Sequence, residues 1–408
     1  MNYFLLLYAF FSPQGTQRKR KVRKIFASFA KNFASFAVKT PIILCLFLCS
    51  CHTPQKNSSQ EIQGEAYLLH HAKGFKAIHH PDYTVVDVLD PWNPRRNLQR
   101  YILIDRNKEI PAYGLPSGTL IRTPIQKIAV YTAVHCAALY ELGVIQDIIG
   151  VCEPRFINHP AIRSRLAEGM ISDMGESISP NTEKMIESGV EVILATPFQN
   201  AGYGAVEKTG IPVIECADYM ETTPLGRAEW IRFLGLFTGK TTLADSLFQE
   251  TETRYLEIKN TMMNIANRPT LFTEKRYGST WYVPAGQSYM AQIYRDAGVG
   301  YIFNDLPGSG GAPLNFETVF DRAIHADYWL FNYNRDAEMT YQSLAAEYAL
   351  YANFDAFKNR RVYGCNTHTS LFYEETPIHP DYLLRELVAI FHPEQMSGYQ
   401  FRYFHLLK

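Results

Sequence analysis

The chain has 408 residues, more than the about 250–300 at which single hydrophobic cores stop growing, so its length predicts two or more domains. Its formal net charge is +0, which excludes the strongly basic field that nucleic-acid-binding proteins use. The 26 Tyr residues exceed what a dry core favours, so we expect some aromatic rings to line a surface or a cleft.

Residues 1–51 read as a lipoprotein signal region. A basic run at 18–24, RKRKVRK, precedes an apolar run at 41–51, PIILCLFLCSC, which is too short to span a bilayer as a mature helix. The final letters LCSC place Leu, Ser and Cys as in a bacterial lipoprotein signal, so we expect Cys51 to be the lipidated first residue. An ordinary signal peptide or a short anchor helix is the alternative. The polar residues 52–62 form the predicted tether.

Four cysteines remain once the signal region is removed: Cys136, Cys152, Cys216 and Cys365. They are scattered and form no Cys-x-x-Cys pair, so neither a zinc ribbon nor a redox pair is indicated. A disulfide is compatible with an extracytoplasmic compartment, but buried free thiols are the expected state.

Residues 63–223 form the predicted N-terminal lobe. Its first part, to residue 122, reads as mixed strands and turns. From residue 126 strands alternate with helices: KIAVY (127–131), a helix at 133–143, DIIGVC (147–152), EVILA (191–195), a helix around 204–209 and IPVIECA (211–217). This alternation predicts βαβ units and a parallel sheet.

Residues 224–269 carry apolar residues at helical spacing and predict a helical segment between two lobes. The sequence TGKTT within it resembles part of a nucleotide-binding loop. Such a loop requires Gly where Leu234 stands, and it follows a strand rather than a helix, so we exclude it. We expect Gly239 to end one helix and Thr241 to cap the next.

Residues 270–408 form the predicted C-terminal lobe, in which the alternation resumes. Its expected elements are TLFTEKRY (270–277), a strand and helix at 280–298, DYWLFNY (327–333), a helix at about 340–357, RVYGC (361–365) and a helix from 379 to 391. The Gly-rich LPGSGGAP (306–313) is expected to be a loop at the edge of a cleft. The chain therefore reads as α/β, long helix, α/β.

One pattern occurs in both lobes. PNTEKMIESGVEVILA (180–195) and LNFETVFDRAIHADYWLF (314–331) each read Asn, one residue, Glu, an amphipathic run and a strand. We expect each Asn to cap a helix, which places Glu183 and Glu317 in first turns, where the helix dipole favours a carboxylate. An acid that only stabilises its own helix is the alternative reading.

Several phrases resemble the helical-backbone (class III) substrate-binding proteins of ABC importers for iron–siderophores, haem and vitamin B12. IAVYTAVHCAALYELGVIQDIIGVCE, DMGESISPNTEKMIESGVEVILA and WYVPAGQSYMAQIYRDAGVGYIF carry this resemblance, which runs from about residue 125 to 395. It implies two Rossmann-like lobes with parallel sheets, joined by a long helix, with a cleft between the lobes. Val190-Glu191 in place of the usual Pro-Asp, and the insert before residue 125, mark a divergent member.

The resemblance also implies a function. A monomeric, lipid-anchored periplasmic protein would capture an Fe(III) chelate, haem or corrinoid and deliver it to a permease dimer with its ATPase. Glu183 and Glu317 would each dock on one permease subunit. No intrinsic cofactor, nucleic-acid partner or enzymatic activity is expected.

Ligand capture is expected beyond the carboxyl ends of the strands. Side chains that follow these strands are the candidates: Tyr131, Thr132, Arg155, Phe156, Phe198, Tyr203, Trp281, Tyr282, Tyr333 and Arg335. Aromatic faces suit a macrocycle or an aryl siderophore. Arg155, Arg276 and Arg335 suit an anionic chelate, which favours an iron complex over a neutral corrinoid. Core packing is the alternative for each aromatic residue.

Two other classes of function compete with this interpretation. A Zn- or Mn-binding protein of related architecture would draw on His135, His159, His325 and His379, although no paired His motif supports it. An enzyme would need a His-Glu-x-x-His, Gly-x-Ser-x-Gly or dinucleotide motif, and the sequence contains none of them.

Overall fold

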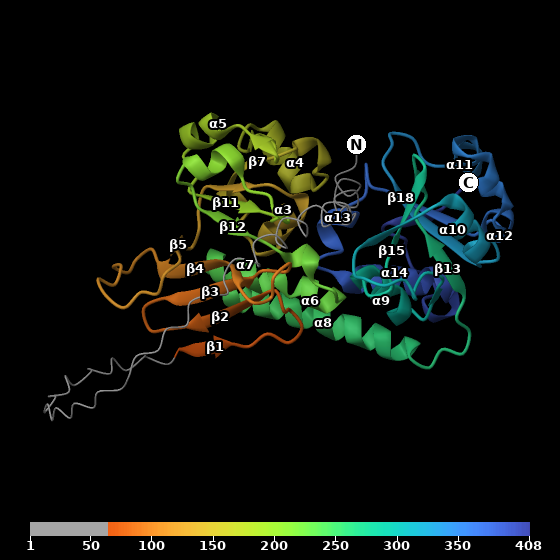
Figure 1. Ribbon diagram of the computed structural model, residues 1–408, viewed down its shortest axis with the longest axis horizontal. Coiled ribbons are helices and arrows are strands. Elements are labelled where there is room, and N and C mark those ends of the chain that lie inside the picture. Colours follow the sequence, from red (N-terminus) through yellow and green to blue (C-terminus); the bar gives the residue numbers. More distant parts are fainter. Residues whose placement is uncertain (1–63) are drawn as a thin grey trace, which may run out of the picture. The chain divides into compact units, whose positions relative to one another are not determined.

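The computed structural model describes residues 64–408 (Figure 1). The predicted signal region 1–51, the tether 52–62 and the lipidated Cys51 lie outside the described residues. Among the helices of residues 64–408, none is both long and apolar enough to cross a membrane.

The first five strands form a sheet of their own, in the order β1-β2-β3-β4-β5 (Figure 1). They are β1 (Glu65–Tyr67), β2 (Phe75–His79), β3 (Thr84–Leu89), β4 (Asn97–Asp105) and β5 (Thr119–Thr123). Neighbours are antiparallel except β4 and β5, which are parallel. Phe75 packs edge-on against Trp230 and Phe233, with ring centroids 5.0 and 5.2 Å apart, so the sheet is covered by a helix of the central segment. The strands expected before residue 122 are confirmed.

A parallel sheet in the order β12-β11-β6-β7-β8 follows, as the alternation predicts. Its strands are β6 (Ile128–Val130), β7 (Ile148–Val151), β8 (Ser172–Asp173), β11 (Val192–Ala195) and β12 (Val213–Glu215). The α-helices between them are α3 (Ala133–Glu141), α4 (Pro160–Ala167) and α5 (Thr182–Glu187). Shorter elements are η1 (Ile145–Asp147), η2 (Pro154–Phe156), β9 (Gly175–Glu176), β10 (Ser179–Pro180), η3 (Gly204–Lys208) and η4 (Asp218–Met220). The helix expected around 204–209 is thus the 3₁₀ helix η3.

Tyr101 of β4 connects the first sheet to the parallel sheet. Its buried hydroxyl donates to the Val213 carbonyl at 2.9 Å and accepts from the Glu215 amide at 2.8 Å. Strand β12 is the edge of its sheet. The Tyr101 hydroxyl therefore satisfies backbone groups that an edge strand would otherwise leave without a protein partner.

The central segment contains three helices, α6 (Pro224–Ala228), α7 (Trp230–Thr238) and α8 (Thr241–Met262). Gly239 follows α7 with φ +67°, so the predicted end of this helix is confirmed. The predicted cap is wrong, because Thr241 is the first residue of α8 and Lys240 precedes it without a side-chain capping bond. The sequence TGKTT lies between the helices α7 and α8. A nucleotide-binding loop would follow a strand, so its exclusion is confirmed.

Helix α8 contributes side chains to two hydrophobic cores. Ala244 and Phe248 belong to the core that includes the first two sheets, and Tyr255, Ile258 and Met262 belong to the core of the C-terminal lobe. One continuous helix of 22 residues therefore packs against both lobes. This is the arrangement expected for a stiff connection between them.

The C-terminal lobe has a sheet in the order β16-β13-β18-β19-β20, parallel except for the antiparallel edge strand β20. Its strands are β13 (Thr270–Thr273), β16 (Gly300–Tyr301), β18 (Tyr328–Tyr333), β19 (Val362–Asn366) and β20 (Phe404–Leu406). Its helices are α9 (Tyr289–Asp296), α10 (Phe316–Ala323), α11 (Tyr341–Glu347), η5 (Ala349–Asn353), α12 (Asp355–Lys358), α13 (Phe372–Glu375), α14 (Pro380–Phe391) and η6 (Pro393–Gln395).

Two expectations for this lobe are wrong in detail. The helix expected at 340–357 is three short helices, because Tyr348 is extended, with φ −162° and ψ 111°. The Gly-rich loop at 306–313 is partly a strand. A second, antiparallel sheet in the order β14-β15-β17 contains β14 (Arg276–Tyr277), β15 (Thr280–Pro284) and β17 (Gly311–Leu314).

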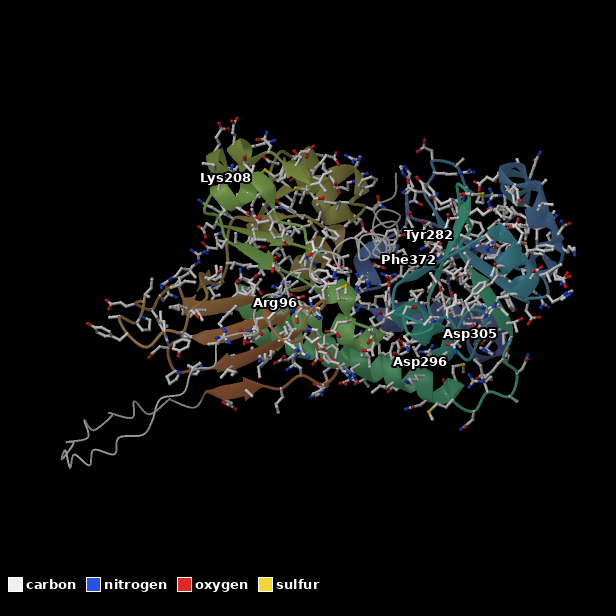
Figure 2. All side chains as sticks on the ribbon, viewed as in Figure 1. Arg96, Lys208, Tyr282, Asp296, Asp305 and Phe372 are labelled. Carbon is white, nitrogen blue, oxygen red and sulfur yellow. The ribbon has the colours of Figure 1, made fainter. Side chains whose placement is uncertain are left out.

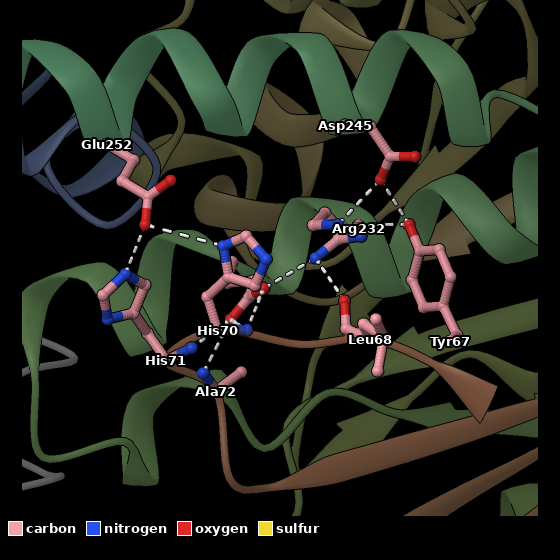
Figure 3. A network of polar contacts seen from close by, with 9 residues as sticks. Tyr67, Leu68, His70, His71, Ala72, Arg232, Asp245 and Glu252 are labelled. Carbon is pink, nitrogen blue, oxygen red and sulfur yellow. Dashed lines mark hydrogen bonds and ion pairs between the residues drawn. The ribbon is translucent and has the colours of Figure 1, made fainter.

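A network of polar contacts connects the start of the described chain to the central helices (Figure 3). The Glu229 side chain, 0% exposed, accepts from the backbone amides of residues 70–72 at 2.9, 2.7 and 2.7 Å. Arg232 pairs with Glu229 and with Asp245 of α8, both at 2.7 Å. Since a buried carboxylate requires compensation of its charge, this network anchors residues 70–72 firmly.

Candidate functional site at the carboxyl ends of both sheets

The two Asn-x-Glu segments adopt the same local structure in both lobes. Asn181 caps α5, accepting from the Lys184 amide at 2.9 Å, and Asn315 caps α10, accepting from the Thr318 amide at 2.8 Å. Glu183 and Glu317 are each the second residue of their helix, and both side chains are exposed. The predicted caps are confirmed; the docking role stays a prediction.

Tyr131 and Thr132 follow β6, as predicted for the first strand-to-helix turn. Tyr131 is 5% exposed, and its buried hydroxyl has no hydrogen-bond partner among the described residues. Thr132 caps α3, and its hydroxyl lies 2.9 Å from Nδ1 of His135. Thr132 therefore has a structural contact that accounts for its position.

Arg155 and Phe156 follow β7 in η2. The Arg155 guanidinium forms two hydrogen bonds with the Glu176 carboxylate, at 2.6 and 2.9 Å, and lies 4.5 Å from the Phe156 ring centroid. The positive charge of this exposed Arg is therefore already matched within its own lobe.

Phe198 and Tyr203 lie in the segment after β11. Phe198 is exposed and lies 6.2 Å from the Tyr219 ring. The buried hydroxyl of Tyr203 interacts with the carboxylate of Glu215, and the Tyr203 backbone amide donates to Glu207 at 2.8 Å. Only Phe198 of the two presents a ring face to solvent.

Trp281 requires a correction, because it belongs to the hydrophobic core. Its side chain is 0% exposed, and its indole N–H donates to the Thr273 carbonyl at 3.0 Å. The ring lies within 6.2 Å of Phe272 and 5.9 Å of Trp329. Trp281 thus has no surface for a ligand in this structure. Its neighbour Tyr282 in β15 is partly buried (Figure 2).

Tyr333 is the last residue of β18, and Arg335 lies two residues beyond it. Tyr333 is 4% exposed and donates its hydroxyl proton to Glu338 at 2.5 Å. Arg335 pairs with Glu347, which also accepts from Lys275 at 2.7 Å. Both predicted residues are therefore engaged within the C-terminal lobe.

The three arginines that favoured an anionic chelate do not converge. Arg155 pairs with Glu176 and Arg335 with Glu347, whereas Arg276 donates to the Gly278 carbonyl at 2.9 Å and stacks on Tyr348. The expectation that they meet one anionic ligand is not supported. The prediction of an iron complex rather than a corrinoid rested mainly on these three arginines, so the structure does not support that preference.

A buried polar chain connects the two lobes, and sequence reasoning did not find it. Nε2 of His135 lies 3.1 Å from the Asp218 carboxylate, which also accepts from Nε of Arg227 at 3.1 Å. The Arg227 guanidinium lies 5.2 Å from the ring centroid of Tyr289 in α9. All but Tyr289 are buried. The contacts run from the end of β12 through α6 to the C-terminal lobe.

The charges of His135, Asp218 and Arg227 in this buried polar chain compensate one another. Burial opposes ionisation of Asp218, but the hydrogen bond from His135 and the charge of Arg227 outweigh burial and lower its pKa. Burial likewise opposes the imidazolium, but Cys216 and Asp218 outweigh it and raise the pKa of His135 to about 10. A buried ion set of this kind is stable only while every member is present.

A second set of contacts between lobes lies at α13. The Asn158 amide of the N-terminal lobe donates to the Glu374 carboxylate at 2.7 Å, and the Asn158 side chain donates to the carbonyls of Thr367 and Ser370. Burial raises the pKa of Glu374 to about 7. The carboxyl ends of β7 and β19 are thus brought together by direct hydrogen bonds.

Glu274, directly after β13, is a further candidate that the sequence interpretation missed. Burial raises its pKa to about 7, against the backbone amide of Asn332 and the charge of Lys275, which act to lower the pKa. It lies close enough to Tyr373 of α13 to influence the pKa of that hydroxyl. A buried acid beside α13 is a typical functional-site signal.

The histidines of the metal-binding alternative lie apart. His135 contacts Asp218, His159 packs against the Tyr140 ring, His325 pairs with Asp355 and His379 lies beside Thr251. In residues 64–408, no group of three or more His, Cys, Asp or Glu side chains is placed to hold a metal ion. Cys136, Cys152, Cys216 and Cys365 are buried free thiols, as expected.

Comparisons with known proteins agree with this architecture. A family model described as periplasmic binding protein matches residues 132–369. An uncharacterized lipoprotein of Methanocaldococcus jannaschii is 28% identical over 321 residues, 75% of each chain.

Solved structures show the same fold at low identity. A periplasmic heme-binding protein from Roseiflexus sp. RS-1 has a TM-score of 0.54 at 16% identity, covering 66% of this chain and 98% of that one. A possible iron-binding protein from Staphylococcus epidermidis has a TM-score of 0.51 at 18% identity, covering 65% and 98%. The β1–β5 sheet precedes the family match.

Proposed function

Because the chain belongs to the periplasmic binding protein family, we propose that it captures an iron chelate, haem or corrinoid between its lobes and delivers it to an ABC permease. The observation that carries this proposal is the family match over residues 132–369, which includes strands of both parallel sheets. Ligands of open α/β sheets bind beyond the carboxyl ends of strands, where the polar chain and Glu274 lie.

The two exposed carboxylates provide the docking part of the proposal. Glu183 and Glu317 occupy equivalent, capped first turns, one in each lobe. Each Glu has a fixed position on its helix and an exposed side chain, and Arg can bind a carboxylate with two parallel hydrogen bonds. One acid per lobe suits a permease dimer with one basic pocket per subunit.

The relatives support attachment to a membrane surface. The Methanocaldococcus jannaschii relative is named a lipoprotein, which agrees with a lipidated Cys51 and the polar tether 52–62. We propose a monomeric periplasmic protein that is lipid-anchored to a bacterial membrane. Mass spectrometry of the mature N-terminus, showing a diacylated Cys51, tests the anchor; an unmodified N-terminus elsewhere contradicts it.

The ligand is identified by what co-purifies with the native protein. Absorption and mass spectra of protein isolated from its own host should show an iron chelate, haem or corrinoid in about equimolar amount. A sugar, amino acid or bare zinc ion at the same occupancy would contradict the proposal.

Docking is tested by separating transport from affinity. Glu183→Ala and Glu317→Ala should each abolish uptake of the co-purified ligand and leave its Kd unchanged, because the carboxylates act on the permease. Glu187→Ala on α5 and Asp321→Ala on α10 are matched controls on the same helices, and both should transport normally. Loss of ligand affinity in the Glu183 or Glu317 variant would refute the docking role.

A further inference from the structure

Glu274 has a backbone conformation that only glycine adopts without strain. It follows β13, which lies between β16 and β18 in the sheet, and its φ is +65°. For a residue with a Cβ atom this left-handed conformation is costly and persists only where the surroundings impose it. Strain of this kind is concentrated at functional sites.

The strained backbone is fixed on both sides by hydrogen bonds. The Glu274 amide donates to the Leu330 carbonyl at 2.8 Å, and its own carbonyl accepts from the indole N–H of Trp329 at 2.7 Å. Trp329 is a fully buried core residue. The Glu274 side chain is therefore aimed by the core of the lobe rather than by a flexible loop.

The Glu274 carboxyl is partly buried and forms no ion pair with a cation of residues 64–408. The charge of Lys275 acts on it, but the Lys275 ammonium pairs with Glu347 at 2.7 Å. A further oxygen acceptor in the neighbouring strand β18, Oδ1 of Asn332, is buried without a hydrogen-bond partner in the described part of the chain. Buried acceptors without donors are rare in folded proteins and require an explanation.

Besides Lys275, the titratable groups around Glu274 in the described residues are tyrosines and one thiol. They are Tyr301 of β16, Cys365 of β19 and Tyr373 of α13. The Glu274 carboxylate lies close enough to each of these groups for its negative charge to raise their pKa. Tyr289 of α9 acts on Tyr373 in the same way and also contacts Arg227 of the polar chain. Glu274 thus adjoins the side chains through which the lobes meet.

Three arginines near the carboxyl ends of the strands are paired with carboxylates: Arg227 with Asp218, Arg335 with Glu347 and Arg155 with Glu176. A fourth, Arg276, donates to the Gly278 carbonyl and lies over the Tyr348 ring. An anionic ligand would have to displace an existing contact of any of these side chains and would meet the Glu274 carboxylate. A ligand with amide or ammonium donors would supply what the acceptors lack.

We propose that Glu274 is a specificity-determining ligand contact that selects uncharged or cationic ligands bearing hydrogen-bond donors over anionic ones. The inference rests on the proposed function, because it assumes capture between the lobes. It deepens that function by restricting the class of chelate or corrinoid that the protein takes.

A panel of ligands that differ in charge tests the selection. Isothermal titration calorimetry of the full-length protein in detergent would compare cyanocobalamin and ferrioxamine B, which carry amide or ammonium donors, with ferric enterobactin and haemin, which are anionic. We expect a donor-bearing ligand to bind at least about 10-fold more tightly than either anionic one, the effect of one charged hydrogen bond.

Variants of Glu274 distinguish a ligand contact from a structural role. Glu274→Gln should weaken binding of the preferred ligand about 10-fold and remove the tightening that the wild type shows between about pH 6 and pH 8 as the carboxyl ionises. Glu274→Gly should lose affinity while keeping or raising the Tm, because glycine relieves the strain. Glu257→Gln, exposed on α8, is the matched control and should change neither.

The results distinguish failure of the role of Glu274 from failure of the proposed function. Tightest binding of an anionic ligand, or unchanged affinity and pH profile in Glu274→Gln, overturns the role of Glu274 and leaves the proposed function standing. A Glu274→Gly variant that unfolds shows that the residue is structural and also overturns the inference. Failure of all four ligands to bind, together with a co-purified ligand of another class, overturns both.

Discussion

In the N-terminal lobe the buried carboxylate of Asp218 lies between His135 and Arg227, whereas the carboxyl of Glu274 in the C-terminal lobe forms no ion pair within the described residues and burial dominates its pKa. Both acids follow strands of a parallel sheet, so the difference lies in their surroundings. A compensated charge contributes to structure, while an uncompensated one is a cost that folding alone does not explain. The comparison therefore separates a structural network from a functional candidate.

The largest effect is expected at the compensated site. Asp218→Ala leaves His135 and Arg227 buried without their counter-charge, which should cost about 3–5 kcal/mol in the free energy of unfolding. Urea denaturation at pH 7 measures it, with exposed Asp336→Ala as a control that should stay near wild type. A loss below about 1 kcal/mol would show that the set is not mutually dependent.

An intermediate effect is expected for Glu274→Gln in ligand-free protein. This substitution should raise the free energy of unfolding, whereas Asp218→Ala lowers it. A carboxyl whose pKa rises to about 7 on folding favours the folded state below its ordinary pKa, and this contribution is lost as pH rises through 7. Glu274→Gln should therefore match the wild type near about pH 4 and exceed its unfolding free energy by about 1–3 kcal/mol near pH 8. Parallel stability curves for the two proteins would contradict the uncompensated burial.

The smallest effect is expected where a compensated charge is exposed. Arg155→Ala removes an ion pair with Glu176 at the surface, which should cost at most about 1 kcal/mol. Thermal unfolding at low and high salt measures it, and any loss should shrink as salt screens the pair. A salt-independent loss above about 2 kcal/mol would place Arg155 with the buried set instead.

Features set by neighbouring residues could be predicted from the sequence. The caps at Asn181 and Asn315, the end of α7 at Gly239 and a parallel sheet in each lobe follow from local patterns and are confirmed, apart from the antiparallel edge strand β20. Where the local signal was ambiguous the interpretation was wrong: Lys240 rather than Thr241 precedes α8, and Tyr348 interrupts a continuous helical pattern.

Pairings across long sequence distances could not be predicted. Arg155 and Arg335 seemed available for a ligand, because nothing local indicates Glu176 or Glu347 as their partners. Trp281 was expected to follow a strand at the first crossover of the C-terminal lobe, but it lies within β15 of a separate antiparallel sheet, and its ring is buried in the core. Glu274 gave no signal, since its left-handed backbone is imposed by β18.

The hydroxyl of Tyr101 has a consequence for behaviour in concentrated solution. An edge strand with open N–H and C=O groups is a template on which a second molecule adds its own strand, the first step towards aggregation. The Tyr101 hydroxyl bonds the Val213 carbonyl and the Glu215 amide, so these two groups of β12 are not open to pairing with another strand. The added sheet β1–β5 thereby protects the molecule against its own copies.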